Sequence, residues 1–579
     1  MPGGTTKDHG LASSPEDGAS YDLLVVGSGA GGMAAAVVGT CKGLTVAVLE
    51  KASVFGGTTA VSAGGTWVPC NHLAQAAGVN DSPQAALDYF RFCAGERLNE
   101  SLARRFIDEA PRMLAYLEEH TLARFSFAAG RPDYRPQAPG AAAQGRTIHP
   151  LPFDGRRLGA QIKRLRQPLR DMTFLGMMIK PGPELKHFLN VLRSFASARY
   201  VTRKLLRHFR DLLIHQRGMD LSNGNALIAR LAKSGFDRGL DIYTDTPVRH
   251  LLIEDGRVTG VVVDHKGHRL TLRARRGVVL ASGGFSHDHE RQQAHFPHVA
   301  RSQEHWSPVP ATVAGDGLRL GEEGGGHVHE GQAHAACWAP VSRVPQAGGQ
   351  FAVIPHLIDR QKPGFIAVTR QGHRFVNEAS SYHDFGQAMI ASCAKESQVS
   401  AFLIADHRAL RRYGMGAVKP APLPIGRHLR SGYLLRGKTL EELASAAGID
   451  TGTFIQTVSS FNSHARQGED PAFGKGGNIY NRYNGDPGHE PNPCLAPIEQ
   501  GPFYAVKLNI GELATLTGMS IDHHARVLTA EGDPVPGLYA CGNDASSVMA
   551  GDYLGGGATL GPGMTFGYLA ACHASGQAD

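Results

Sequence analysis

Apolar and polar segments begin to alternate regularly at Tyr21, after a polar stretch of twenty residues. An apolar run, Leu23 to Val26, is followed by a glycine-rich turn, an alanine-rich helical segment and a second apolar run, Leu44 to Leu49. Strand, turn, helix and strand in this order predict one complete βαβ unit.

The rest of the chain divides into stretches of different pattern. Residues 100 to 240 have mostly helical spacing, and residues 300 to 500 mix short strands with proline-rich turns. Residues 243 to 285 predict several short strands, with turns at Asp255-Gly256 and Lys266-Gly267 and a final buried strand from Gly277 to Ala281. The C-terminal part contains another hairpin pattern and a glycine-rich stretch.

This order predicts an α/β protein with a Rossmann-like nucleotide-binding domain assembled from both ends of the chain. We expect its first part over residues 20–300, with a helical insertion at about 100–235, and its second part over residues 505–579. An inserted α+β catalytic domain would occupy residues 301–504.

Composition narrows the class of protein. Hydrophobic residues make up 42% of the 579 and charged residues 19%, which is typical of a globular chain of two or three domains. The 72 glycines have no collagen-like period and gather in particular loops, which favours close approach of the backbone to a ligand. Eight cysteines without a CxxC pair argue against a zinc site or a disulfide framework, so we expect no metal.

Charge and hydropathy bear on location. The sequence has no signal-peptide pattern and no apolar run of 18 residues, and its cysteines suggest a reducing compartment, so we expect a cytoplasmic protein. The net charge of +7 arises mainly between residues 155 and 238. We interpret it as a local feature suited to anionic lipid and not to nucleic acid.

The turn after the first strand has the GxGxxG spacing of a dinucleotide site. Gly27 allows the tight turn, Gly29 lets a pyrophosphate touch the backbone, and Gly32 lets helix and strand pack closely. The helix N-terminus supplies amide donors. Glu50, at the end of the second strand, would accept hydrogen bonds from a ribose hydroxyl.

A second backbone-rich loop follows soon after Glu50. Its sequence, GGTTAVSAGG over residues 56–65, adds hydroxyl groups from two threonines and a serine. A long ligand that stays bound needs a second cradle of this kind, whereas an exchanging nicotinamide cofactor usually does not. The loop therefore favours FAD over NAD.

Taken together, GSGAGG, Glu50-Lys51, GGTTAVSAGG, LASGGF (residues 280–285) and GLYACGN (residues 537–543) resemble the flavoprotein superfamily of fumarate reductases and 3-ketosteroid dehydrogenases. The resemblance implies an FAD-binding domain with an inserted catalytic domain. Covalent members carry a histidine in the loop that corresponds to residues 56–65, and its absence here implies non-covalent FAD. The implied cofactor-binding residues are Gly27, Ser28, Gly29, Ala30, Gly32, Glu50, Lys51, Gly57, Thr58, Thr59, Ser62, Gly64, Gly65, Val248, Ala281, Gly283, Gly542, Asn543, Thr559 and Leu560.

Three tyrosines lie in motifs similar to those of 3-ketosteroid Δ1-dehydrogenases: Tyr553 in DYLGGGATLGPG, Tyr382 in NEASSYHDF and Tyr134 in RPDYRPQAPG. The resemblance implies that Tyr553 and the Gly557 amide polarise the C3 carbonyl of a steroid, while Tyr382, assisted by Tyr134, takes the C2 proton. FAD would take the C1 hydride, and an unidentified acceptor would receive the electrons. A phenol with a pKa near 10 needs a shifted pKa or a relay to act as a base.

The function expected from this resemblance is the 1,2-dehydrogenation of a 3-ketosteroid or of a 4-en-3-one sterol in steroid degradation. Two alternatives keep the fold: a 3-oxo-5α-steroid 4-dehydrogenase and a fumarate reductase-like enzyme acting on a small unsaturated acid. A flavin-binding protein without activity is a third. The family usually carries prolines where this chain has Leu554 and Gly556, and a lysine-glycine-glycine where it has residues 517–519, which leaves the substrate shape open.

Residues 172 to 214 join a methionine-rich apolar segment, which ends at Lys180, to a basic helical segment. Helical spacing gathers the apolar residues of RKLLRHFRDLL on one face: Leu205, Leu206, Phe209, Leu212 and Leu213. We expect a lid helix that buries these residues against its own domain. The alternative is a peripheral contact with an anionic membrane surface.

Overall fold

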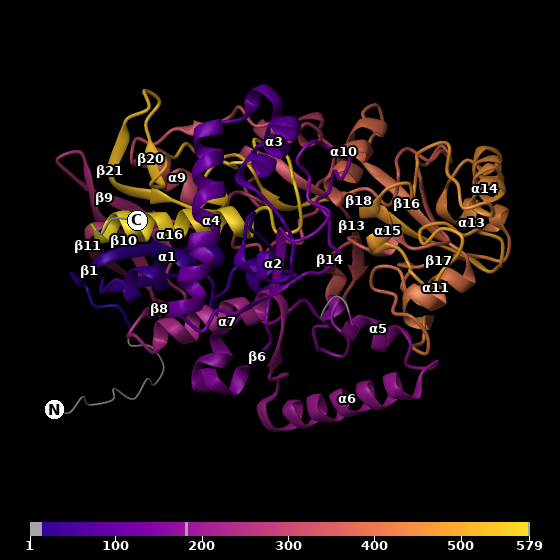
Figure 1. Ribbon diagram of the computed structural model, residues 1–579, viewed down its shortest axis with the longest axis horizontal. Coiled ribbons are helices and arrows are strands. Elements are labelled where there is room, and N and C mark those ends of the chain that lie inside the picture. The colour runs from indigo at the N-terminus through magenta and orange to yellow at the C-terminus, as the bar shows by residue number, and fades with distance from the viewer. Residues whose placement is uncertain (1–13, 180–182, 577–579) are drawn as a thin grey trace.

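The computed structural model describes residues 14–179 and 183–576 (Figure 1). Most of the polar N-terminal stretch and Lys180 lie outside the described residues. The expected βαβ unit is confirmed, with β1 over Ser20–Val26, α1 over Ala30–Cys41 and β2 over Val46–Leu49. β1 and β2 are parallel, and their apolar side chains are buried.

The first sheet combines strands from both ends of the chain. Its path is β20-β21-β11-β1-β2-β8, in which β21, β11, β1, β2 and β8 are parallel and β20 is antiparallel at the edge. β9 and β10 extend it as a hairpin beside β11, with turns at the expected places, 255–256 and 266–267. The bounds are β8 Asp241–Tyr243, β9 Val248–Glu254, β10 Arg257–His265, β11 His268–Leu280, β20 Arg526–Leu528 and β21 Pro534–Ala540.

Glycines let α1 pack directly on the last helix, α16 (Leu560–Ser575), and Figure 1 shows the two side by side. A Cβ on Gly31 would lie 2.9 Å from the Gly563 carbonyl oxygen, and a Cβ on Gly567 would lie 2.4 Å from that of Gly31. The close contact requires small residues on both helices. It joins the two ends of the chain next to the glycine-rich turn that follows β1.

The second sheet has the path β14-β13-β18-β16-β15, with β17 beside β18. It lies in the half of the molecule that also carries α11, α13 and α14 (Figure 1). Because β18 runs to Thr515, this sheet continues past the boundary expected at 504–505. The bounds are β13 Ala336–Pro345, β14 Phe351–Pro355, β15 Phe365–Val368, β16 Ser400–Ala405, β17 Leu435–Gly437 and β18 Phe503–Thr515; α10 Tyr382–Ser392, α11 His407–Tyr413, α12 Gly426–Arg430, α13 Leu440–Ala447, α14 Thr451–Ala465 and α15 Ile479–Asn484.

Most of the remaining elements, from β3 to α7, lie between β2 and β8 in the sequence, where helices were expected over residues 100–235. Their bounds are α2 His72–Ala76, α3 Pro83–Ala94, α4 Glu100–His120, α5 Pro183–Leu189, α6 Phe195–His215, α7 Asn223–Phe236, α8 His289–His295 and α9 Asp316–Glu323; β3 Thr66–Trp67, β4 Phe125–Phe127, β5 Thr147–Pro150, β6 Phe153–Asp154, β7 Asp220–Leu221, β12 Val328–His329 and β19 Gly518–Met519. No helix in the described residues is long and apolar enough to cross a bilayer.

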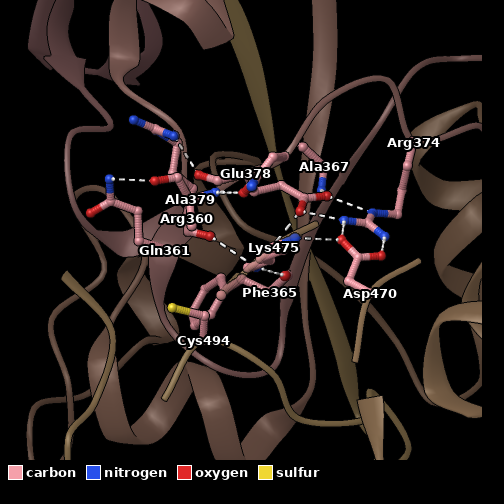
Figure 2. Close-up of polar contacts among 12 residues, drawn as sticks. Arg360, Gln361, Phe365, Ala367, Arg374, Glu378, Ala379, Asp470, Lys475 and Cys494 are labelled. Atoms are coloured by element: carbon pink, nitrogen blue, oxygen red, sulfur yellow. Dashed lines mark hydrogen bonds and ion pairs between the residues drawn. The ribbon is translucent and has the colours of Figure 1, made fainter. Parts of the chain in front are cut away.

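A buried ion network stabilises the second sheet (Figure 2). Arg374 donates to Glu378 and to Asp470, each at 2.7 Å. Lys475 Nζ donates to the Phe365 carbonyl at 2.5 Å and lies 3.8 Å from Glu378. Two buried carboxylates and two buried cations therefore neutralise one another beneath the strand β15.

Helix α6 lies along one edge of the molecule (Figure 1). We expected it to bury its apolar residues, and for three of them this expectation is wrong. Leu206, Phe209 and Leu213 are 66%, 45% and 86% exposed, while Leu205 and Leu212 are half-buried. The helix packs instead through Val201 and through the buried polar residues Ser197, His208 and Asp211. Its buried Asp211 forms an ion pair with Arg156, and this pairing sets which face of α6 is covered.

Candidate functional site

A single cavity of about 770 Å³ lies between the two sheets and collects every site residue predicted from the sequence. Its lining includes all twenty of the expected cofactor-binding residues and Tyr134, Tyr382, Tyr553 and Gly557. These residues come from segments far apart in the chain, from Gly27 to Leu560. The fold therefore brings the two predicted groups into one continuous space.

At the first βα turn, the glycines have the geometry that a phosphate cradle needs. Gly27 has φ +107°, and a Cβ there would lie 2.2 Å from the Ala281 carbonyl oxygen. A Cβ on Gly32 would lie 2.3 Å from the Gly27 carbonyl oxygen, whereas the Cβ position of Gly29 is open. The space over Gly29 and the N-terminus of α1 fits a pyrophosphate group.

Glu50 is buried at the end of β2 and is held in place by its neighbours. It accepts hydrogen bonds from the hydroxyl of Ser28 and, at 2.8 Å, from the amide of Ala52. Burial raises the pKa of Glu50, while these hydrogen bonds oppose the rise. Its neighbour Lys51 forms an ion pair with Asp316 at 2.8 Å, also at the cavity wall.

The loop over residues 56–65 forms a second wall of the cradle. Thr59 Oγ1 accepts a hydrogen bond from the amide of Ala30 at 3.1 Å, which joins this loop to the N-terminus of α1. Gly57 and Gly64 have φ of +51° and +69°, conformations that favour glycine.

The third wall comes from the C-terminal part of the chain. Gly542 has φ +66° with open space at its Cβ position, and Asn543 donates to the Gly283 carbonyl at 3.4 Å. Thr559 and Leu560 line the cavity at the start of α16. Amide-rich turns and a helix N-terminus supply donors for phosphates, and the buried carboxylate of Glu50 supplies an acceptor for a ribose hydroxyl, so the residues present fit FAD.

The three tyrosines form one cluster at the other end of the cavity. Tyr134 OH donates to Tyr382 OH at 3.3 Å. The ring of Tyr553 lies 5.5 Å from that of Tyr382 and 6.0 Å from that of Tyr134, measured between centroids. A fourth tyrosine, Tyr480, packs 4.8 Å from Tyr134 and was not predicted from the sequence.

Gly557 supplies an unused donor beside this cluster. Its φ is +94°, and a Cβ would lie 2.2 Å from the Gly65 carbonyl oxygen, so only glycine fits. Its carbonyl accepts hydrogen bonds from Trp67 and Gly561, but its amide has no acceptor among the described residues. A substrate oxygen could accept from this amide.

Two contacts fix the loops that carry Tyr134 and Tyr553. The Leu554 carbonyl accepts from the Tyr134 amide at 3.0 Å and from Tyr89 OH at 2.8 Å. Hydrogen bonds to the Leu554 carbonyl thus hold this stretch at a position where the resembled family usually has proline.

Tyr382 is positioned from its N-terminal side. It begins α10, whose cap, Ser381, accepts from the Asp384 amide. Arg360 donates to the carbonyls of Glu378 and Ser380, the latter at 2.7 Å (Figure 2 shows Arg360 and Glu378). The buried ion network around Glu378 therefore holds the segment that leads into Tyr382.

Burial makes all three tyrosines weaker acids. It raises the pKa of Tyr134 to about 12, with Arg131 acting in the opposite direction. It raises the pKa of Tyr382 well above the ordinary value, and the nearby Tyr134 raises it further. The pKa of Tyr553 is also raised by burial. All three are neutral phenols at neutral pH, which suits Tyr553 as a hydrogen-bond donor.

Sequence reasoning missed the apolar wall and the cations of the cavity. The wall extends away from the tyrosines to α6 and the loop over residues 413–423, through Phe174, Met178, Ile179, Phe188, Val191, Val201, Leu205, Met415, Val418 and Leu423. Arg131 and His149 lie at the tyrosine end. Arg131 belongs to the motif that contains Tyr134, so its position beside that residue was visible in the sequence.

Comparisons with known proteins agree with this geometry. A family described as FAD binding domain matches residues 22–560. The chain is 42% identical to the 4-oxocyclohex-2-ene-1-carboxylate 5-dehydrogenase of Sinomonas cyclohexanicum, covering 95% of this chain and 92% of that protein. It is 35% identical to the 3-oxosteroid 1-dehydrogenase of Mycobacterium tuberculosis, covering 96% and 99%.

Among solved structures, the chain is similar to 3-ketosteroid Δ1-dehydrogenase from Sterolibacterium denitrificans in complex with 1,4-androstadiene-3,17-dione. The TM-score is 0.88 and the identity is 35%, over 96% of this chain and 99% of that one. The whole architecture is therefore shared, including both sheets and the insertion between them.

Proposed function

The chain belongs to the FAD-binding flavoprotein family that includes the 3-oxosteroid 1-dehydrogenases, and on that premise we propose that it desaturates a cyclic ketone next to its carbonyl. It is an oxidoreductase whose cofactor is FAD. The observation that carries the proposal is the set of donors at one end of the cavity, where the unpaired Gly557 amide lies beside the clustered phenols of Tyr553, Tyr382 and Tyr134.

In this proposal, Tyr553 OH and the Gly557 amide donate hydrogen bonds to the ketone oxygen. These donors stabilise negative charge as the α-carbon loses its proton, and burial strengthens the effect. Tyr382 takes that proton, and its hydrogen bond with Tyr134 provides a path for it to leave. Bound FAD supplies a two-electron acceptor for the hydride that leaves the β-carbon, and a separate acceptor must then reoxidise the cofactor.

Two substrate classes share this reaction. One class is a 3-ketosteroid, into which the enzyme would introduce a 1,2 double bond. It is supported by the solved structure at 35% identity and by the apolar wall that extends toward α6. A small cyclic keto acid is supported by the 4-oxocyclohex-2-ene-1-carboxylate 5-dehydrogenase at 42% identity and by a 4-oxocyclohexanecarboxylate 2-dehydrogenase of the same organism at 35% identity. Both place a six-membered ring ketone at the tyrosines, so the chemistry of the site does not separate them.

Reduction of an artificial dye by the purified holoenzyme tests the proposal. Androst-4-ene-3,17-dione, a 5α-reduced 3-ketosteroid, cholest-4-en-3-one, 4-oxocyclohexane-1-carboxylate and succinate are offered in parallel. Turnover of at least one cyclic ketone, with a new double bond next to its carbonyl, supports the proposal. Turnover of succinate alone, or protein without flavin absorbance, overturns it.

We also propose that α6 contacts an anionic membrane surface. Its exposed apolar residues Leu206, Phe209 and Leu213 lie among the exposed cations Arg203 and Arg207. An apolar stripe flanked by basic residues has the charge and shape to lie at the headgroup level of such a surface. The apolar wall of the cavity reaches Leu205 on this helix, so the contact would lie close to the cavity.

A further inference from the structure

Three arginines lie close together in the segment that carries Tyr134, and two of them are fully paired. Arg146 forms ion pairs with Asp81 at 2.8 Å and with Asp133 at 2.9 Å. Arg135 pairs with Asp552 and, at 3.3 Å, with Asp384. The acidic residues near this segment are thus already taken.

Arg131, the third arginine, faces the cavity without a counter-charge. Among the described residues, the ion pairs of this segment are those of Arg135 and Arg146, and none joins Arg131 to a carboxylate. Its Nη1 lies 3.1 Å from His149 Nε2. Burial, together with Arg131, lowers the pKa of His149 to about 3, so that imidazole is neutral and accepts the hydrogen bond. A guanidinium has five N–H donors. His149 accepts from one of them and the Tyr134 hydroxyl is a second partner, which leaves donors for a further acceptor.

Gly556 makes the space that the guanidinium occupies. A Cβ at Gly556 would lie 2.5 Å from Arg131 Nη2 and 2.8 Å from its Cζ. Any larger residue here, including the proline that is usual in the resembled family, would push the guanidinium aside. The position of the Arg131 guanidinium therefore depends on the glycine at 556. Gly556 precedes Gly557, whose amide is proposed to donate a hydrogen bond to the ketone oxygen.

We propose that Arg131 binds a carboxylate of the substrate, located within about one ring's length of the ketone. A half-buried guanidinium without a counter-charge is unfavourable, and a substrate carboxylate would supply both the charge and a bidentate acceptor. An apolar steroid ring at this place would leave the charge unpaired. The inference rests on the proposed ketone desaturation and selects the keto acid from the two substrate classes.

Other cations of the cavity wall are less suited to this role. Lys51 is paired with Asp316 beside the nucleotide cradle. Lys419 donates to the Asp171 backbone carbonyl at 2.6 Å, and burial lowers its pKa. Lys419 belongs to the loop over residues 413–423, not to the tyrosine end, and serves as the matched control.

The test compares 4-oxocyclohexane-1-carboxylate with its methyl ester, which keeps the ketone and removes the charge. In Arg131→Gln and in Gly556→Ala, KM for the acid should rise roughly 30- to 100-fold while KM and kcat for the ester change less than about threefold. Arg131→Lys should recover part of the loss. Lys419→Gln should change KM for the acid less than about threefold.

A binding measurement supports the kinetics. Cyclohexanecarboxylate, which has no ketone to oxidise, should perturb the flavin absorbance of the wild-type holoenzyme, and its Kd should rise by a similar factor in Arg131→Gln. FAD content and Tm of each variant show that it is folded.

Three results would overturn the inference. Equal losses for acid and ester would place Arg131 at the shared ketone oxygen, and a larger loss in Lys419→Gln would place the carboxylate elsewhere. Turnover of steroids without any turnover of the keto acid would refute the inference while the ketone desaturation stands. If the wild-type protein oxidises no cyclic ketone, the proposed function itself fails.

Discussion

Arg135 donates two hydrogen bonds to Asp552, and this ion pair joins the residue after Tyr134 to the residue before Tyr553. The two phenols come from segments more than four hundred residues apart in the chain, so their relative position depends on such cross-links. The pair is mostly buried, since the side chain of Asp552 is 7% exposed.

Asp552→Asn should keep FAD but lower both stability and turnover. Breaking a buried ion pair costs about 3 kcal/mol, and small displacements of reacting groups reduce kcat by roughly 10- to 100-fold. Tm and kcat are measured together. Glu100→Gln, in the exposed ion pair with Arg91, is the control and should cost less than about 1 kcal/mol. Wild-type turnover in Asp552→Asn would show that the pair does not position the tyrosines.

Tyr553→Phe should retain the flavin spectrum and lose roughly 100- to 1,000-fold in kcat, because it removes one donor to the ketone oxygen. Tyr433→Phe is the control: its buried hydroxyl bonds Ser342 and the Ala417 amide, and Tyr433 is not among the residues that line the cavity, so kcat should change less than about threefold. Nearly wild-type turnover by Tyr553→Phe would contradict the role assigned to this residue.

The chemical step should speed up with rising pH. Tyr382 must be deprotonated to act as the base, and burial raises its pKa, so the reactive fraction increases about tenfold per pH unit below that pKa. Single-turnover flavin reduction between pH 7 and 10 should rise without a plateau, and a deuterated α-carbon should slow it. A plateau reached near pH 7 would indicate a base with a lower pKa.

Glu378→Gln should destabilise the fold by about 3 to 5 kcal/mol at pH 7 by removing a carboxylate from the buried network. Burial alone would raise the pKa of Glu378, but Arg374 and Lys475 lower it below the ordinary value. A depressed carboxyl pKa stabilises the fold above the unfolded pKa, and this contribution is lost as pH falls through the folded pKa.

Urea unfolding at several pH values checks this. The difference between wild type and Glu378→Gln should shrink below about pH 4, where the unfolded carboxyl is protonated. The exposed neighbour Glu469 provides the control Glu469→Gln, which should cost less than about 0.5 kcal/mol at every pH. A pH-independent difference would argue against the ionised state of Glu378.

Phe209→Asp with Leu213→Asp should weaken binding to vesicles that contain anionic lipid, while Tm stays the same, because both side chains are exposed in the fold. Co-sedimentation at low and high salt measures it. Ile479→Asp, at a residue 48% exposed on α15, is the control and should bind as wild type does. Wild-type protein that stays in the supernatant when such vesicles are pelleted would contradict the membrane proposal.

Local rules made the nucleotide cradle predictable. The roles of Gly27 and Gly32 follow from backbone geometry at a single turn, so the spacing of glycines was sufficient to find them. The tyrosine cluster required the resemblance to a family, because nothing within the motif of Tyr134 indicates contact with Tyr382.

Arg131 and α6 show what the sequence leaves open. Whether an arginine is paired depends on which carboxylates the fold has already given to Arg135 and Arg146. An amphipathic pattern likewise shows two faces without saying which is covered. In α6 the covered face carries Val201 together with Lys204 and Asp211, which pair with Glu184 and Arg156.

Because α1 and α16 come from opposite ends of the chain, their contact forms only late in synthesis. Residues that line the nucleotide cradle occur at the first strand of the sheet and again at Gly542 and beyond. A ribosome delivers the first of these more than five hundred residues before the last. During that interval the nascent chain has half a cradle, and β11 lacks its neighbour β21 until residues 534–540 have been made. Cofactor capture is therefore a late event, and flavin content reports that both halves of the domain have met.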